Sequence, residues 1–284
     1  MRVGLVLSGA AAKGAYEIGA LKAIQEYFPP EEIRYISASS SGTITGYAYS
    51  CGKLDEVFDI WRNINKDHEK LFIRTVISSD FFKNSLAAVA ADEAKAERFY
   101  VTLLNLDDKS CRYVNLQGLS EEERAVRLQA AMAIMALMKP VEIDGERYLD
   151  GAIIDNSPVS PLLAHDPDYV ICIHFDKHEY AFESEEFDRK LIKIVFNENT
   201  TFLKDSVWVT RDGTERMFDD GYRKTKAILD DVFSEGTENL GVIYEKIRKM
   251  NARRPEKEMR LTADIVLNNL TRITRKFTKP EVNE

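Results

Sequence analysis

The 284-residue sequence contains little cysteine and little histidine. Its three cysteines, Cys51, Cys111 and Cys172, share no CxxC spacing, and their odd number leaves one unpaired in any disulfide scheme. This pattern excludes a disulfide scaffold and a cysteine-rich zinc module, and it is typical of a reducing compartment. None of the four histidines stands in an HExxH arrangement, which argues against a zinc hydrolase.

Long apolar runs and a positive net charge are also absent. No apolar stretch approaches the ~20 residues that a membrane-spanning helix requires. The net charge of −8 at pH 7 disfavours general nucleic-acid binding, which needs a basic surface. No credible cleavage region follows the short apolar run at residues 1–7, so we expect a strand there and a cytoplasmic protein.

The residues that are present predict a folded α/β chain. Hydrophobic residues make up 44% of the sequence, enough for one large domain with a substantial core. Val3 to Leu7 is nearly all apolar, as expected of a strand buried on both faces of a parallel sheet. Small residues and a helical apolar pattern follow, and the same order repeats from residue 33. This alternation predicts a parallel sheet covered by helices.

The later pattern is less regular. It predicts strands at 99–106 and 111–116, a helix over 121–138, and a hairpin around the Asp144-Gly145 dipeptide. A buried strand is expected at 169–175, and residues 176–220 show weak periodicity. The remainder is predicted to be helical.

The first of three small-residue turns runs from Ser8 to Gly14 (SGAAAKG), between a predicted strand and helix. Small side chains allow backbone N–H groups at a helix N-terminus to approach an anion closely. The turn matches neither the Walker pattern nor the dinucleotide GxGxxG pattern. An anion-binding loop and a plain strand–helix turn both stay open as interpretations.

The second turn, ASSSG at residues 38–42, places Ser40 between a strand and a helix. A serine on such a sharp turn is held out of the fold with helix amides close to it, as in a nucleophile elbow. Ala38 and Gly42 stand where the usual GxSxG elbow has its two glycines. A serine-rich helix cap is the alternative interpretation.

The third turn, Asp150-Gly151, follows the predicted hairpin. A serine hydroxyl is a weak nucleophile at pH 7 unless a base accepts its proton, and an aspartate at a strand end is a candidate for that base. An ordinary Asp-Gly turn is the alternative.

Taken in order, the three turns resemble the motifs of the patatin-like phospholipase family. The matching segments are LVLSGAAAKGAYEIGALKAI, ASSSGTITG and YLDGAIIDNSPV, and the resemblance covers residues 3–50 and 128–175. It implies a three-layer α/β/α sandwich with a mostly parallel central sheet. A single domain is expected over residues 1–284, with the core motifs in 3–175 and a cap segment and C-terminal helices in 176–284.

The resemblance also implies a reaction and its residues. Ser40 corresponds to the nucleophile and Asp150 to its partner in a Ser–Asp dyad. The implied oxyanion hole is formed by Gly9, Ala10 and Ala11, with Lys13 as the nearby cation. The implied activity is hydrolysis of fatty-acyl esters of phospholipids or lysophospholipids through an acyl-enzyme, with no metal or organic cofactor.

Three positions depart from the family pattern. Ala10 and Ala11 replace glycines of the first turn, and Ala38 replaces the leading glycine of the elbow. Alanine keeps the N–H donor but is strained wherever the backbone needs a positive φ. A degenerate member that binds lipid acyl chains without hydrolysing them is therefore one alternative. A Ser–Asp–His α/β hydrolase, completed by His165, His174 or His178, is another.

Two expectations concern partner surfaces. Residues 245–284 contain eleven Lys/Arg and six Asp/Glu, which predicts peripheral attachment to an anionic lipid surface and no nucleic-acid partner. The candidate cations are Arg248, Lys249, Arg253, Arg254, Lys257 and Arg260. Five aromatic residues are expected to line an acyl tunnel or to belong to the core: Phe182, Phe187, Phe196, Phe202 and Trp208.

Overall fold

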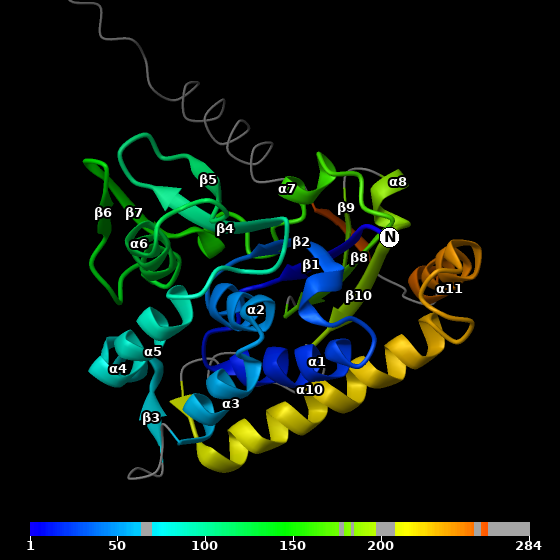
Figure 1. The fold of residues 1–284 in the computed structure, drawn as a ribbon, viewed down its shortest axis with the longest axis horizontal. Helices are drawn as coiled ribbons and strands as arrows, with labels where there is room; N and C mark the ends of the chain where they lie inside the picture. Colours follow the sequence, from blue (N-terminus) through cyan, green and yellow to red (C-terminus); the bar gives the residue numbers. More distant parts are fainter. Residues whose placement is uncertain (64–69, 176–178, 183–184, 197–207, 253–256, 261–284) are drawn as a thin grey trace, which may run out of the picture.

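The computed structural model describes residues 1–63, 70–175, 179–182, 185–196, 208–252 and 257–260. At its centre is an eight-stranded sheet with the order β10-β8-β1-β2-β4-β7-β6, in which β5 pairs with β4 (Figure 1). Its strands are β1 (Val3–Leu7), β2 (Ile33–Ala38), β4 (Arg98–Asn105), β5 (Cys111–Asn115), β6 (Val141–Ile143), β7 (Glu146–Asp150), β8 (Tyr169–His174) and β10 (Leu191–Val195).

The sheet is parallel in its centre and antiparallel at one end. The pairs β10–β8, β8–β1, β1–β2 and β2–β4 are parallel, whereas β4–β5, β4–β7 and β7–β6 are antiparallel. The two strands predicted at 99–106 and 111–116 therefore form the antiparallel pair β4–β5, and the hairpin predicted around Asp144-Gly145 forms the pair β6–β7. The carboxyl ends of β1, β2 and β8 lie together at one edge of the sheet, because these strands are parallel neighbours.

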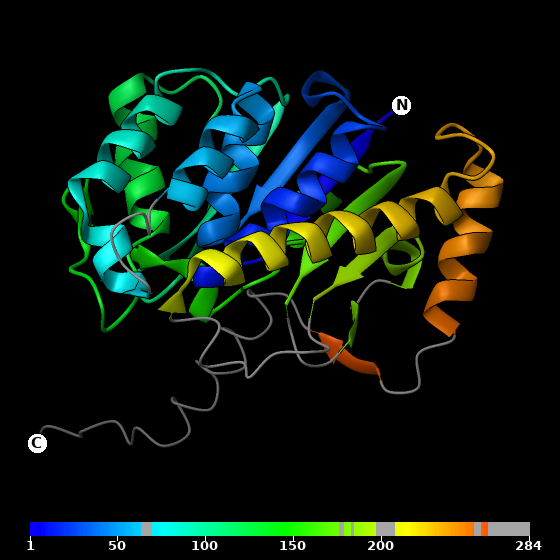
Figure 2. The ribbon, with the colours of Figure 1, turned by 90° about the horizontal axis from the view of Figure 1, so that it is seen from below.

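Most helices cover one face of the sheet (Figures 1 and 2). Because side chains alternate along a strand, Leu5 and Leu7 of β1 and Ile171 of β8 point into the large core on this face. The helices described in the chain are α1 (Gly14–Gln25), α2 (Ser41–Cys51), α3 (Leu54–Asn63), α4 (Ile73–Ser78), α5 (Asp80–Ala90), α6 (Glu121–Ala131), α7 (Ser160–Leu163), α8 (Glu185–Asp188), α10 (Arg211–Val232) and α11 (Leu240–Ala252).

The opposite face has a thinner cover. Val6 of β1 and Val170 of β8 belong to a second core, which is closed by Leu162 of α7 and Phe187 of α8. The predicted three-layer α/β/α arrangement is confirmed, with one layer made of long helices and the other of short ones.

Shorter elements connect these layers. They are the 3-10 turns η1 (Ala11–Lys13), η2 (Pro30–Glu32) and η3 (Gly151–Ile153), the antiparallel pair β3 (Leu71–Phe72) and β11 (Trp208–Val209), and the parallel pair β9 (Glu179–Phe182) and β12 (Lys257–Arg260). In the described part of the chain, the helices are too short or too polar to cross a bilayer.

Helix α10 lies directly against α1, the helix that follows the first small-residue turn (Figure 2). A Cβ added at Gly19 of α1 would lie 2.1 Å from the Phe218 carbonyl oxygen, and one added at Gly221 of α10 would lie 2.2 Å from the Tyr16 oxygen. The two backbones therefore touch at this crossing, and α10 fixes the position of α1.

We expect Gly19→Ala and Gly221→Ala each to lower the free energy of unfolding by about 2–4 kcal/mol, because the added methyl group forces the helices apart. Urea denaturation measures the change. Gly241→Ala in α11 is the matched control, since the nearest atom to its added Cβ is 3.8 Å away. Equal stabilities for the three variants would contradict the close crossing.

Candidate active site

Ser40 lies at the carboxyl end of β2, immediately before α2. Its backbone has φ 51° and ψ −129°, a conformation that a residue other than glycine adopts only under local constraint. A Cβ added at Gly42 would lie 2.8 Å from the Leu7 Cβ and 2.9 Å from the Leu7 oxygen. Glycine at 42 therefore allows the first turn of α2 to pack directly against the end of β1. The chain between β2 and α2 makes the sharp turn predicted for the elbow.

Asp150 is the last residue of β7, and its side chain is buried. Its carboxyl accepts a hydrogen bond from the Ala152 N–H at 2.9 Å. Burial raises the pKa of Asp150 to about 6, and the nearby Ser40 hydroxyl and the Ala152 N–H act in the opposite direction. The structure therefore brings together the two residues predicted to form the dyad.

The chain around Asp150 explains its position. The Asp150 N–H donates to the Ala133 oxygen at 3.0 Å, and a Cβ at Gly151 would lie 2.6 Å from the Thr102 Cγ2. The predicted helix over 121–138 is too long: α6 ends at Ala131. Ala136 has a φ of 66°, which is incompatible with a right-handed helix. The chain after α6 leaves the helix and accepts the hydrogen bond from the Asp150 N–H through the Ala133 oxygen.

Gly9 of the first turn lies directly against Ser40. A Cβ at Gly9 would be 2.6 Å from both the Ser40 Cβ and the Asn156 Oδ1. The Gly9 N–H donates to Asn156 Oδ1 at 2.9 Å, and the Asn156 amide donates back to the Gly9 oxygen at 3.0 Å. Asn156 thus fixes both peptide groups of Gly9 in place.

The predicted oxyanion hole is only partly open. The Gly9 N–H is bound to Asn156, and the Ala10 N–H donates to Ser41 Oγ at 2.9 Å. Both amides must exchange these acceptors before they can bind a ligand. Within the described residues, the Ala11 N–H donates to no protein acceptor.

The three alanines at predicted glycine positions differ in conformation. Ala11 has a φ of 50°, in the left-handed region, whereas Ala10 has a φ of −134°. Ala38, the last residue of β2, is not among the residues with positive φ. The strain expected from the departures is therefore confined to Ala11. Lys13, the predicted cation, is 1% exposed at the start of α1.

A buried polar network lies behind this turn, and the sequence reasoning missed it. Ser41 Oγ, which accepts from Ala10, lies 3.5 Å from Glu17 Oε2, and the Thr45 hydroxyl donates to the same oxygen at 3.1 Å. Burial raises the pKa of Glu17 well above its usual value, and its Oε1 has no hydrogen-bond partner among the described residues. A carboxyl at position 17, among the apolar positions of α1, is the sequence signal for this network.

A second set of polar contacts joins the end of β1 to the loop after Asp150. The Ser8 and Ser157 hydroxyl oxygens are 2.5 Å apart, and the Ser157 N–H donates to Asp155 Oδ1 at 3.1 Å. The Tyr113 hydroxyl donates to Asp155 Oδ2 at 2.7 Å. The loop that carries Asn156 is therefore held at both sides.

Of the three histidines considered for a triad, two lie in the described part of the chain and the third lies outside it. The His165 ring stacks on Tyr35 at 4.6 Å, and its Nε2 is 2.8 Å from the Tyr100 hydroxyl. His174 is buried in β8. Neither His165 nor His174 contributes to the pKa shift of Asp150. His178 lies outside the described residues. No group of three or more potential metal ligands from His, Cys, Asp and Glu occurs in the described ranges.

The aromatic residues considered for an acyl tunnel divide between core and surface. Phe187 and Phe196 are buried, and Phe196 stacks on Tyr16 at 5.1 Å. Trp208 is partly exposed. The Phe182 side chain and Phe202 lie outside what the structure describes, as do Arg253, Arg254 and the side chains of Lys257 and Arg260. Arg248 and Lys249 are exposed on α11.

Residues 5–163 match the family model described as patatin-like phospholipase. Among curated proteins, an uncharacterized NTE family protein of Mycobacterium tuberculosis is 25% identical over 188 residues, which cover 63% of this chain and 50% of that protein. Lysophospholipase NTE1 of Saccharomyces cerevisiae is 24% identical over 178 residues, covering 57% of this chain and 10% of that protein. The chain thus spans half the length, or less, of these relatives.

Among solved structures, the crystal structure of VipD from Legionella pneumophila has a similar fold. The TM-score is 0.51 at 15% sequence identity, and the alignment covers 81% of this chain and 67% of that one. The similarity supports the α/β architecture of the sheet and its helices.

The φ difference between the two turn alanines gives a stability prediction. Ala11→Gly and Ala10→Gly both increase the entropy of the unfolded chain, but only Ala11→Gly relieves a left-handed alanine. We therefore expect Ala11→Gly to be more stable than Ala10→Gly by about 1–2 kcal/mol in urea denaturation. The reverse order would show that the Ala11 backbone is unstrained.

Proposed function

The chain belongs to the patatin-like phospholipase family, and we propose that it hydrolyses fatty-acyl esters of phospholipids or lysophospholipids. Ser40 is the proposed nucleophile and Asp150 the proposed base. The observation that carries this proposal is the proximity of the Ser40 hydroxyl, on a turn where Ser40 has a positive φ, to the buried Asp150 carboxyl.

In the proposed reaction, the Ser40 oxygen attacks the ester carbonyl carbon while Asp150 accepts the hydroxyl proton. The tetrahedral intermediate collapses, its bond to the leaving alcohol breaks, and Asp150 returns the proton to that alcohol. Asp150 then takes a proton from water, whose oxygen attacks the acyl carbon of the acyl-Ser40 ester. As the bond between this carbon and the Ser40 oxygen breaks, Asp150 returns the proton to Ser40 and the fatty acid is released. No histidine takes part in this sequence.

The environment of Asp150 suits a general base. A base is most effective when its pKa lies near the working pH. Burial raises the pKa of Asp150 to about 6, which makes its ionised form more basic than an ordinary aspartate and still abundant at pH 7.

Apolar side chains enclose a cavity of only about 10 Å³ one helical turn beyond Ser40, so an acyl chain would have to displace them to enter. Ile44 of α2 and Trp61 of α3 line a small apolar pocket together with Phe82 and Leu86 of α5. Its remaining lining residues are Val57, Ile60 and Val89. Lysophospholipase NTE1 of yeast matches this chain, which supports acyl esters of lipids as the substrate class.

A peripheral membrane location in the cytoplasm is part of the proposal. The basic segment 245–284 includes the exposed residues Arg248 and Lys249, and Lys/Arg clusters near an anionic lipid surface contribute ~1 kcal/mol each. A lipid ester in a bilayer would then reach the site without a spanning helix.

Lipid binding without hydrolysis is the second candidate function. It is favoured by one observation: the Gly9 and Ala10 amides already have protein acceptors, and the remaining donor, Ala11, is in a strained conformation. Removing a single oxyanion donor typically lowers the rate ~10²–10³-fold.

Labelling with a fluorophosphonate probe distinguishes the two candidates. We expect the probe to label wild-type protein at Ser40, and both Ser40→Ala and Asp150→Asn to abolish labelling, because one removes the nucleophile and the other its base. Ser39→Ala is the matched control on the same turn. Folded wild-type protein that binds fatty acid but resists the probe would favour the non-hydrolytic candidate.

The pH dependence of kcat/KM tests the role of Asp150. The reaction needs the ionised carboxylate, so we expect the rate to fall about tenfold per pH unit below the pKa of about 6 and to level off above it. His165→Gln should leave this pH profile unchanged, because the His165 ring does not contribute to the pKa shift of Asp150. A midpoint near pH 4 would show that Asp150 is not buried in solution as it is in the structure.

A further inference from the structure

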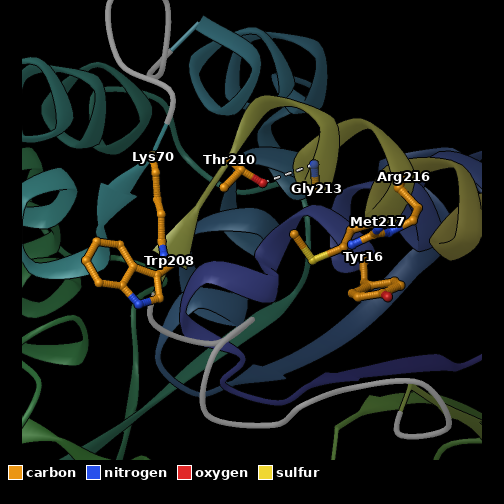
Figure 3. A pocket seen from close by; sticks show the side chains of 7 residues that line it. All are labelled: Tyr16, Lys70, Trp208, Thr210, Gly213, Arg216 and Met217. Atoms are coloured by element: carbon orange, nitrogen blue, oxygen red, sulfur yellow. Dashed lines mark hydrogen bonds between the residues drawn. The ribbon is translucent and has the colours of Figure 1, made fainter.

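A second cavity, distinct from the Ser40–Asp150 contact, is formed by three separate segments of the chain (Figure 3). Its volume is about 320 Å³, which is in the range of small-molecule sites. The lining residues are Tyr16 of α1, Lys70 just before β3, Trp208 of β11, Thr210, and Gly213, Arg216 and Met217 of α10.

Backbone pairing and buried side chains support the walls of this cavity. Trp208 and Val209 pair with Phe72 and Leu71, which fixes Trp208 beside Lys70. The Thr210 hydroxyl accepts a hydrogen bond from the Gly213 N–H at 3.2 Å, drawn as the dashed line in Figure 3. Val209 and Met217 are buried, which holds the wall formed by β11 and α10 in place.

The lining residues that the structure describes carry a net positive charge. Lys70 and Arg216 contribute two cations, and none of the seven lining residues is acidic. The nearest carboxylates along α10 do not cancel Arg216: Glu215 accepts from Arg62 Nε at 2.6 Å, and no ion pair joins Asp212 to Arg216 in the described ranges. Figure 3 shows Lys70 with Trp208 on one side of the pocket and Arg216 with Tyr16 on the other.

The position of Tyr16 links this cavity to the edge of the sheet where Ser40 lies. The Tyr16 ring stacks on Phe196 at 5.1 Å and packs on Phe175 at 6.2 Å. Phe175 and Phe196 directly follow β8 and β10, at the carboxyl ends of these parallel strands. Ser40 occupies the same edge at the end of β2.

We propose that this cavity, lined by Lys70, Arg216, Trp208 and Tyr16, binds the anionic phosphate-bearing headgroup of the lipid substrate. The inference rests on the proposed function, because it assigns a headgroup site to the ester that Ser40 attacks. Cations that form charge-assisted hydrogen bonds with phosphate oxygens provide the recognition.

The same geometry selects against a choline headgroup. The face of an aromatic ring is the usual binding surface for a quaternary ammonium group. The Lys70 ammonium already lies 4.0 Å from the centroid of the Trp208 ring, so this face is occupied by a cation. A choline group would also be repelled by Lys70 and Arg216. The cavity therefore favours a headgroup with net negative charge, such as phosphoglycerol.

The test compares monomeric dihexanoyl phosphatidylglycerol with dihexanoyl phosphatidylcholine, both below their critical micelle concentrations. Without a lipid surface, the basic C-terminal segment cannot produce a preference by membrane attachment. We expect the full-length protein to favour phosphatidylglycerol in kcat/KM by about tenfold, and Lys70→Gln/Arg216→Gln to reduce the preference to about twofold.

Arg74→Gln/Arg211→Gln is the matched control, because both residues are exposed cations close in sequence to the pocket residues but outside its lining. This control should keep the preference for phosphatidylglycerol. A wild-type protein without the preference, or a pocket variant that keeps it, would overturn the assignment. Thermal unfolding of each variant shows that it is folded.

Binding to the Ser40→Ala protein separates this inference from the proposed activity. Isothermal titration with the same phosphatidylglycerol should give binding that the added Lys70→Gln/Arg216→Gln changes weaken about tenfold, whether or not the wild-type chain hydrolyses lipid. If the protein binds the lipid but the wild-type chain does not hydrolyse it, the result contradicts the proposed activity and leaves the headgroup assignment intact. Inorganic phosphate that binds as tightly as the lipid would identify free phosphate as the ligand and overturn the headgroup assignment.

Discussion

Two backbone contacts without room for a side chain determine the geometry of the site. Gly9 lies against Ser40, and Gly42 lies against Leu7, so the turn after β1 and the turn after β2 meet at contact distance. A methyl group at either glycine would overlap neighbouring atoms by several tenths of an ångström. The strained φ of Ser40 and the position of α2 both follow from this meeting of two strand ends.

Buried polar side chains maintain these contacts. Asn156 binds both peptide groups of Gly9, and Ser41 links the Ala10 N–H to Glu17 at the start of α1. Each buried donor or acceptor that loses its partner destabilises the fold by about 1–3 kcal/mol, so the network resists displacement of the turn. Helix α10 adds a third constraint by fixing α1 through Gly19. The residues of the proposed dyad, Ser40 and Asp150, are a small part of this arrangement.

The sequence predicted the parts of the fold that depend on local pattern. The alternation of apolar strands with helices and the Asp144-Gly145 turn predicted the sheet and the β6–β7 hairpin. The three turns, through their resemblance to the family motifs, predicted Ser40 and Asp150 as a dyad, and the structure places these two residues close together. The sequence could not show that Asn156 and Ser41 occupy the Gly9 and Ala10 amides, because these contacts join residues 147 and 31 positions apart. The early end of α6 was missed for the same reason: the Ala133 oxygen binds Asp150, which is distant along the chain.

The occupied amides affect which species the proposed site would bind best. A neutral ester carbonyl is no better an acceptor for the Gly9 N–H than the Asn156 amide oxygen, so the substrate gains little by displacing it. A developing oxyanion is a charged acceptor, and hydrogen bonds to charged groups are roughly twice as strong as neutral ones. Exchange of acceptors would then occur as charge develops on the carbonyl oxygen. Under the proposed mechanism, the closed turn stabilises the transition state in preference to the bound ester, which is the condition for catalysis.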